Sequence, residues 1–234
     1  MSLHVLRIWL PDRPGALGAV ASRVGAVGGD VIGIDILERG AGRAVDELLI
    51  ELPDASLVGL LVDEVREVDG VDIEDVRQTA DAVLDPRLDA LETAAMLMGS
   101  ADPDELVAML CDHAARMVTA GWGVVVDTES QEVFPGWGES PPTAWLLAFL
   151  EGSVAASRSG DAGQPDDVLW APLPAARMAV VLGREGRTFR ARERRTIAAL
   201  ARIVDARFRD LSEQRSRRWH PAAARSVDLD LIRS

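Results

Sequence analysis

Apolar and polar residues alternate with two different periods over the first 78 residues. A period of two, typical of strands with one buried face, marks four short runs, and a spacing of three to four marks two longer ones. In the first longer run, Leu17, Val20, Val24 and Val27 fall on one face of a helix. The predicted elements are a strand at 4–10, a helix at 16–28, strands at 30–38 and 44–52 around a glycine-bearing break, a helix at 54–68 and a strand at 71–78.

The order of these elements predicts the fold of the first domain. Strand, helix, strand, strand, helix and strand in fewer than 80 residues imply a ferredoxin-like antiparallel sandwich with both helices on one face. Asp54 is suited to cap the second helix, and Gly70 ends it.

The rest of the chain carries the pattern of a second domain, an antiparallel sheet with flanking helices, so the fold class is α+β. Asp102 caps a helix with Pro103 at its first position and Glu105 at its third. The predicted elements are helices at 86–98 and 102–120, strands at 122–128 and 131–137, a helix at 143–158, a loop at 159–167, strands at 168–174 and 177–185, and a long helix at 191–214. The predicted boundaries are a first domain at 1–78, a linker at 79–85, a second domain at 86–214 and a C-terminal tail at 215–234.

Composition excludes several classes of function. The 234 residues suit two ordinary domains, and the net charge of −13 argues against nucleic acid as the partner. The single cysteine rules out an internal disulfide, and no apolar run reaches the length of a membrane span. We expect a cytoplasmic protein without a membrane anchor or an export signal.

The charge is unevenly distributed along the chain. Residues 184–234 hold 14 of the 25 arginines but only 7 of the 38 acidic residues. This split can place a basic helix against an acidic surface, within the chain or across a dimer, or it can reflect a solvated helix face.

The turn DRPGALG, from Asp12 to Gly18, has the chemistry of an anion site. Pro14 restricts Arg13 to extended geometry and fixes its own φ, and Gly15 permits a conformation that a Cβ would hinder. The first N–H groups of a helix starting at Ala16 could bind a carboxylate, such as that of an amino acid. Asp12 and Asp30 are candidate acceptors for the ammonium group, although Asp12 could simply cap the helix.

A first strand followed by DRPGAL, a helix, and then GGDVIGIDI resembles an ACT domain, the small regulatory module that commonly senses amino acids. The resemblance covers residues 3–78. It implies a homodimer in which the ligand lies between the loop after the first strand and the start of the partner's second strand. The ligand-binding residues carried over by position are Leu10, Asp12, Gly15, Ala16 and Leu17 on one side and Asp30 and Val31 on the other.

Two departures from the family pattern bear on this site. Some ligand-binding members have a polar residue where Leu10 stands, and often Asn where Asp12 and Asp30 stand. Two carboxylates favour a cationic group and repel a carboxylate. The alternative function is therefore a dimerisation or protein-interaction module whose ligand sites are vacant.

Residues 86–211 resemble a small GAF-like domain. The run APLPAARMAVVLGREGRTFRARERRTIAALARIVDARF, two apolar strands before a long amphipathic helix, is similar to the end of such domains. The resemblance implies that the final helix packs on its partner. Because the middle is short, we expect no cyclic-nucleotide or chromophore site.

No arrangement of residues indicates catalysis, so we expect a protein that is not an enzyme and needs no cofactor. His4, His113 and His220 are isolated from other metal ligands, which predicts no metal site. We expect Cys111 to be a small buried residue. Trp122, Trp137, Trp145 and Trp170 more often fill a core or an interface than bind a base or sugar.

The predicted function is a non-catalytic sensor that binds an amino acid at an ACT dimer interface and transmits the signal through the GAF-like domain, with a protein partner possible. The last twenty residues are either a disordered tail or a segment that adds a strand to a sheet edge.

Overall fold

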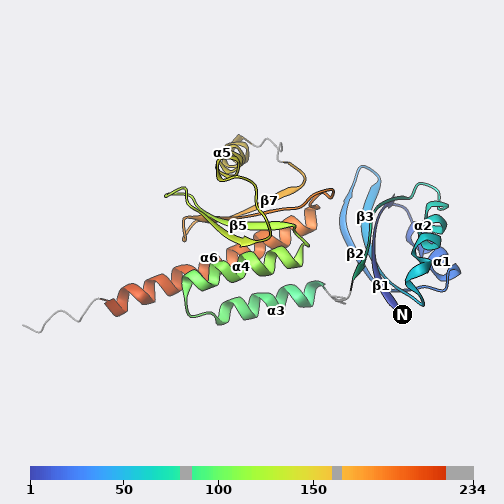
Figure 1. The fold of residues 1–234 in the computed structure, drawn as a ribbon, viewed down its shortest axis with the longest axis horizontal. Helices are drawn as coiled ribbons and strands as arrows, with labels where there is room; N and C mark the ends of the chain where they lie inside the picture. The colour runs from blue at the N-terminus through green and yellow to red at the C-terminus, as the bar shows by residue number, and fades with distance from the viewer. Residues whose placement is uncertain (80–85, 160–164, 220–234) are drawn as a thin grey trace, which may run out of the picture.

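The computed structural model describes residues 1–79, 86–159 and 165–219, which form two domains side by side (Figure 1). The order of elements in the first domain is the predicted one. These elements are β1 (Ser2–Pro11), α1 (Ala16–Ala26), β2 (Asp30–Gly40), β3 (Arg43–Leu52), a 3₁₀ turn (Ala55–Leu57), α2 (Val58–Arg66) and β4 (Asp72–Thr79).

The four strands of the first domain form an antiparallel sheet in the order β2-β3-β1-β4, with α1 and α2 on one face (Figure 1). Alternate residues of β1 point toward the helices, where Leu6 and Ile8 are buried against Val20 of α1 and Leu61 of α2. The predicted sandwich with both helices on one face is confirmed. β2 is an edge strand, and the opposite face of the sheet turns toward the second domain.

The second helix is shorter than the predicted span of 54–68. Asp54 accepts a hydrogen bond from the backbone N–H of Ser56 at 2.8 Å, and the N–H of Leu57 donates to the Asp54 carbonyl at 3.2 Å. This i→i+3 bond makes the first turn 3₁₀. The α-helix therefore runs only from Val58 to Arg66.

The second domain is a four-stranded antiparallel sheet in the order β6-β5-β8-β7. In Figure 1, α5 covers one face of this sheet, α4 and α6 cover the other, and α3 packs on the outer side of α4 and α6. A separate hydrophobic core fills each side. The elements are α3 (Pro86–Gly99), α4 (Pro103–Met117), β5 (Trp122–Asp127), β6 (Val133–Trp137), α5 (Thr143–Ser159), β7 (Val168–Leu173), β8 (Met178–Gly183) and α6 (Ala191–Trp219).

The predicted cap of α4 is confirmed, since the Asp102 carboxylate accepts from the backbone N–H groups of Asp104 and Glu105. The last helix is longer than predicted, because α6 continues past residue 214 to Trp219. Residues 80–85 of the predicted linker, part of the predicted loop at 159–167 and the tail from residue 220 lie outside the described residues. So does the predicted strand addition by the tail.

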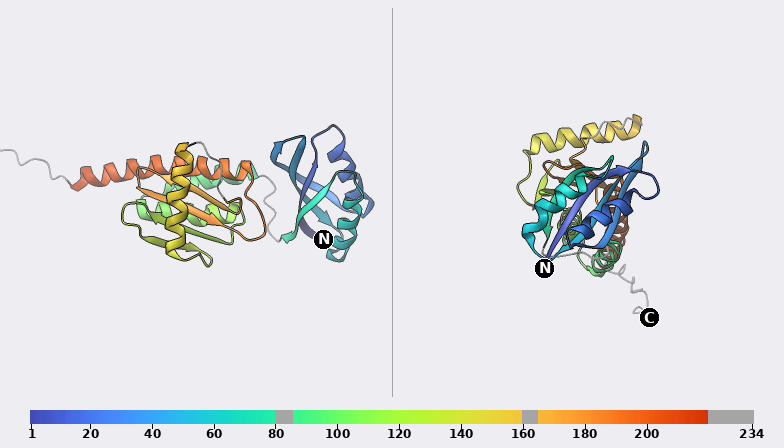
Figure 2. Two further views of the ribbon diagram at one scale, coloured as in Figure 1. Left: turned by 90° about the horizontal axis from the view of Figure 1, so that it is seen from above. Right: turned by 90° about the vertical axis from the view of Figure 1, so that its right-hand side faces the viewer.

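The N-terminal end of α6 lies beside the first sheet (Figure 2). Arg190 reaches Glu38 at 3.6 Å, and Arg192 pairs with Asp35, so both arginines contact the edge strand β2. No described helix is long and apolar enough to span a membrane.

Candidate functional site

The turn between β1 and α1 has the geometry that its sequence predicts. Gly15 is the residue before the helix and has a left-handed φ of 88°, a conformation that other residues adopt only with strain. A Cβ there would have no atom within 4 Å, so the backbone angle, and not lack of space, requires glycine. Among the described residues no side chain caps α1 by a hydrogen bond, so Asp12 is not its cap.

The predicted ligand-binding residues of this turn divide into two groups. Leu10 and Ala16 are buried in the core of the domain, where their side chains fix the position of the turn. Asp12 and Gly15 are exposed, and Leu17 is half-buried against the core. The accessible groups of the turn are therefore the Asp12 side chain and the backbone at Gly15 and Gly18, whereas the N–H of the buried Ala16 donates to the Arg13 carbonyl at 3.3 Å.

Asp30 and Val31, the other predicted half of the site, lie at the opposite end of the sheet. Pro11 at the end of β1 pairs with Arg43 of β3, whereas Asp30 pairs with Glu51 of the same strand. Eight residues along a strand correspond to about 27 Å. One chain therefore does not bring the two halves of the predicted site together.

A buried carboxylate that the sequence analysis did not single out lies near the turn. Asp46 of β3 is 3% exposed, and its Oδ1 has no hydrogen-bond partner among the described residues. Burial raises its pKa, Arg39 lowers it and the neighbouring Asp12 raises it further, with a net increase. Asp46 lies on the same face of β3 as the buried Leu48 and Ile50. An acidic residue at a position where the alternation calls for an apolar one could therefore have identified it from the sequence.

A network of buried charges joins the outer face of this sheet to α6. Arg7 of β1 is 1% exposed and pairs with Glu47 of β3 at 2.9 Å and with Glu193 of α6 at 3.4 Å. Burial lowers the pKa of Arg7, but Glu47 and Glu193 outweigh burial and raise it. Arg184 pairs with the same Oε1 of Glu193 at 2.8 Å and with its Oε2 at 2.9 Å. In the sequence, this contact could have been noticed only from Arg7, the one arginine or acidic residue within β1.

Further arginines of the second domain contact acidic residues of the first sheet. The pairs are Arg187 with Asp75 at 3.2 Å, and Arg190 with Glu74. Together with Arg192 and Asp35, they confirm within one chain the predicted contact between the basic C-terminal segment and the acidic body.

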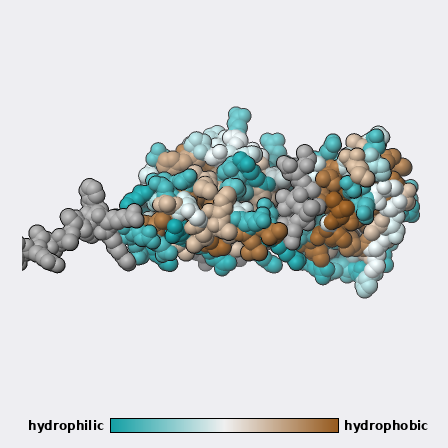
Figure 3. Space-filling view, turned by 90° about the horizontal axis from the view of Figure 1, so that it is seen from below, coloured by the Kyte–Doolittle hydropathy of each residue, from teal (hydrophilic) through white to brown (hydrophobic). Residues whose placement is uncertain are grey.

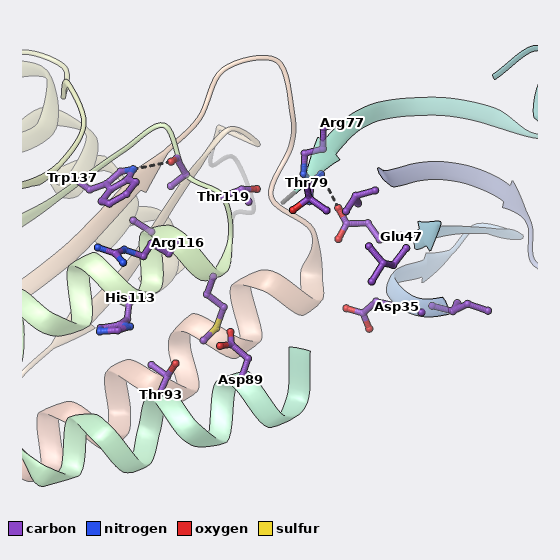
Figure 4. Close-up of a pocket in the computed structure, with 17 residues that line it drawn as sticks. Asp35, Glu47, Arg77, Thr79, Asp89, Thr93, His113, Arg116, Thr119 and Trp137 are labelled. Carbon is purple, nitrogen blue, oxygen red and sulfur yellow. Dashed lines mark hydrogen bonds and ion pairs between the residues drawn. The ribbon is translucent and has the colours of Figure 1, made fainter. Parts of the chain in front are cut away.

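A cavity of about 680 Å³ lies between the domains (Figure 4). Figure 4 shows α3 and α4 on one side of it and strands of the first sheet on the other. Arg77 donates to Glu47 at 3.2 Å on the sheet side, and Arg116 stacks on the Trp137 ring with 5.2 Å between the guanidinium carbon and the ring centroid. The remaining polar lining groups are Asp35, Thr79, Asp89, Thr93, His113 and Thr119.

The cysteine and two of the tryptophans considered in the sequence analysis pack against other side chains of the second domain. Cys111 is buried in the main core of the second domain, as predicted, and burial raises the pKa of its thiol to about 12. Trp122 packs against the smaller core, but Trp145 is 41% exposed and stacks on Phe149, with 5.5 Å between ring centroids. Within the described ranges, no group of three His, Cys, Asp or Glu side chains could hold a metal ion.

The comparisons place the first domain in a known family. Residues 4–70 match the model of the ACT domain. The chain is similar to the ACT domain from the GTP pyrophosphokinase of Chlorobium tepidum, in a crystal structure (20% identity, 34% of this chain and 100% of that chain, TM-score 0.28) and in a solution NMR structure (20%, 34% and 88%, TM-score 0.27). It is also similar to an unknown protein from Galdieria sulphuraria, with 12% identity over 91% of this chain and 92% of that chain and a TM-score of 0.33. No curated protein matches the chain.

The family match covers both helices and the first three strands of the observed domain and ends just before β4. The GAF-like resemblance of the second domain stays a prediction. The N-terminal domain of this chain, matched over residues 4–70, is therefore an ACT domain.

Proposed function

We propose that this chain is a non-catalytic regulator whose ACT domain binds an amino acid between two copies of the chain. The observation that carries the proposal is the pair of separated half-sites. Gly15 and Gly18 at the start of α1 are exposed, and Asp30 and Val31 lie about 27 Å away along the same sheet. A second copy can supply the missing half.

The turn has groups for both charges of an amino acid. The N–H of Ala16 already donates to the Arg13 carbonyl, and the next N–H groups of α1, those of Leu17 and Gly18, sit at the positive end of the helix dipole and favour a carboxylate. Asp12 and Asp46 are carboxylates next to the same turn and favour an ammonium group. A bound ammonium also favours the ionised form of Asp46, so ligand binding and loss of its proton are expected to be coupled.

The edge strand β2 supports pairing of two copies. Ile32, Ile34 and Ile36 are exposed along it, and Ile34 is 51% exposed. Antiparallel pairing of two β2 strands about Asp35 would set Asp30 of the second copy opposite Gly40. That end of β2 carries the hairpin whose Gly42 carbonyl accepts from the Asp12 N–H at 2.9 Å. The second copy's half-site would therefore approach the turn.

The route of transmission that we propose is the buried charge network. Arg7 lies in β1, a central strand of the ACT sheet, and pairs with Glu193 near the start of α6. Arg192 ties α6 to Asp35, in the middle of the edge strand where two copies would meet. A change in β2 would thus reach the second domain, for which we keep the GAF-like assignment as part of the proposal.

A second candidate function is a dimerisation module without a ligand. It is favoured by one observation, the exposed acidic side chains of Asp12 and Asp30 in the two half-sites. These charges repel the carboxylate of an amino acid.

Thermal unfolding with each of the twenty amino acids, together with the mass of the assembly in solution, tests the two candidates. We expect one or a few amino acids to raise the Tm of a dimer; at 100 times Kd the stabilisation is about 2.7 kcal/mol. Asp12→Ala should abolish the shift, and Asp63→Ala, an exposed acid on α2, should retain it. A dimer that none of the twenty stabilises would support the vacant module, and a monomer would refute both.

A further inference from the structure

Trp9 lies where the two domains meet. It belongs to β1, and the guanidinium carbon of Arg190, the residue before α6, lies 4.6 Å from the centroid of its ring. The guanidinium carbon of Arg43 in β3 lies 5.4 Å from the same centroid. Seen from below, the two domains lie next to each other along the long axis of the molecule, with hydrophilic residues on the surfaces of both (Figure 3). The indole therefore contacts one arginine from each domain at the boundary between them.

Glu74 of β4 joins the indole to the arginine of the second domain. The indole N–H of Trp9 donates to Oε2 of Glu74 at 2.9 Å, and the guanidinium of Arg190 pairs with the same oxygen. The side chains of Arg190 and Glu74 are only 12% and 13% exposed, and a cation over an aromatic ring is held more strongly when both are removed from water. Trp9, Glu74 and Arg190 thus contact one another, and we call these three residues the Trp9 latch.

The ACT-domain side of the Trp9 latch is attached to the turn between β1 and α1. Trp9 precedes Asp12 by three residues in the chain. Arg43, which contacts the indole, follows Gly42, and the Gly42 carbonyl accepts from the Asp12 N–H at 2.9 Å. Arg43 is itself held by Asp72 at 2.6 Å. Both segments that position Asp12, the end of β1 and the hairpin opposite, therefore contact the indole.

The other side of the Trp9 latch is attached to α6. The backbone N–H of Arg190 donates to Oε2 of Glu193 at 2.7 Å, and the carbonyl of Arg190 accepts from the Arg194 N–H at 3.1 Å. Glu193 is bound in turn by Arg184 of the same domain. Because these bonds fix Arg190 to the first turn of α6, the position of the second domain decides where its guanidinium lies.

The Trp9 latch leaves two buried polar atoms without their full set of partners. Among the described residues, Oε1 of Glu74 and Nε of Arg190 have no hydrogen bond. Arg7 lies 3.8 Å from Oε1 of Glu74, close enough for an ion pair but too far for a hydrogen bond. Unmet hydrogen bonds of buried atoms cost free energy that water restores on exposure. Since each domain also has its own core, this contact is suited to open while both domains stay folded.

We propose that Trp9 and Arg190 are positioning residues for the turn between β1 and α1, and that they hold this turn only while the second domain is docked on the ACT sheet. Opening of the Trp9 latch frees the end of β1 and the hairpin at Arg43. A ligand that needs the ordered turn then favours docking, and docking favours the ligand by the same factor. This last step rests on the proposed function, whereas the link from Arg190 to the turn needs no ligand.

Hydrogen exchange of the full chain without ligand, followed by mass spectrometry, tests the link. Arg190→Met removes the guanidinium and keeps a long side chain. We expect exchange in the peptide that carries residues 12–18 to become about 2- to 30-fold faster, the factor that corresponds to the strength of one cation–π contact. Exchange in α4 should stay unchanged, because a general loss of stability would raise it there too.

Arg187→Met is the matched control. Arg187 also bridges the domains, but its partners are Asp75 at 3.2 Å and Thr119 instead of Trp9. This variant should leave exchange in residues 12–18 within about twofold of the wild type. Equal exchange in Arg190→Met and Arg187→Met would overturn the proposal.

Trp9→Phe provides a milder second variant, which keeps an aromatic ring and removes the N–H that Glu74 accepts. It should also speed exchange in residues 12–18, and adding Arg190→Met to it should have less effect than Arg190→Met alone, because the two residues act as a unit. Fully additive effects would contradict the Trp9 latch.

The twenty amino acids then separate this proposal from the proposed function. An amino acid that stabilises the wild type should bind Arg190→Met more weakly by the factor found in exchange. Equal binding to both proteins would refute the coupling between docking and ligand. Faster exchange in Arg190→Met without binding of any amino acid would support the Trp9 latch and refute the proposed function.

Discussion

Replacing Arg7 by methionine removes the central cation of the interdomain network while keeping a long apolar side chain. Arg7 is 1% exposed, and its loss leaves Glu47 and Glu193 without one partner each. Removing one member of a buried pair costs about 3–5 kcal/mol when the other is left alone. Here Arg77 stays 3.2 Å from Glu47 and Arg184 stays 2.8 Å from Glu193, so we expect a loss of about 2–3 kcal/mol.

Urea unfolding followed by tryptophan fluorescence measures this loss, and thermal unfolding should show a Tm lower by about 4–12 °C. Arg23→Met is the matched control, because Arg23 is 45% exposed and its pair with Glu64 at 2.8 Å is a surface contact. Its effect should stay within about 0.5 kcal/mol. If Arg7→Met were as mild as Arg23→Met, the view that this buried network holds the two domains together would be wrong.

Three more predictions follow from single groups. Gly15→Ala forces alanine into the left-handed region and should lower the unfolding free energy by about 1–2 kcal/mol, whereas Gly18→Ala inside α1 should be neutral or stabilising. Urea titration of both variants measures these free energies, and equal values for the two would contradict the prediction. Burial raises the pKa of Glu193, but Arg184 and Arg7 outweigh burial and lower it overall, so its stabilisation is present above the usual Glu pKa of about 4.3 and is lost as pH falls through the folded value. Glu193→Gln should flatten the acid side of the stability–pH curve, and an unchanged acid side would contradict this. Cys111, with a pKa of about 12, should react with a thiol reagent only after unfolding. The rate of thiol modification should then equal the rate of unfolding, and a faster reaction would contradict the prediction.

Much of the ACT domain could be predicted from the chain. The period of two along β1 and β3 and the helical spacing in α1 report burial of one face, which is a local property of consecutive residues. The turn at Gly15 was equally local, since a left-handed residue before a helix calls for glycine. The Asp102 cap needed only a side chain and the next two N–H groups.

The roles of several charged residues could not be predicted in the same way. Arg7 lies on the sheet face opposite the helices, which would be a solvent face if the ACT domain stood alone. Its burial comes from Glu193 and Thr188, more than 180 residues later in the chain. The end of α6 was also misplaced, because arginine-rich sequence continues without a stop signal up to Trp219.

The sequence by itself determined the order of the elements, the conformation of the first turn and the residue types that could recognise an amino acid. Only the tertiary structure decided that Asp12 does not cap α1 and that Asp46 is a buried carboxylate near the turn between β1 and α1. It also decided that Asp30 lies at the opposite end of the sheet from this turn. The physical reason is that periodicity and capping depend on neighbours along the chain. Distances between half-sites and the burial of charges depend on which strands pair and which domain covers a face.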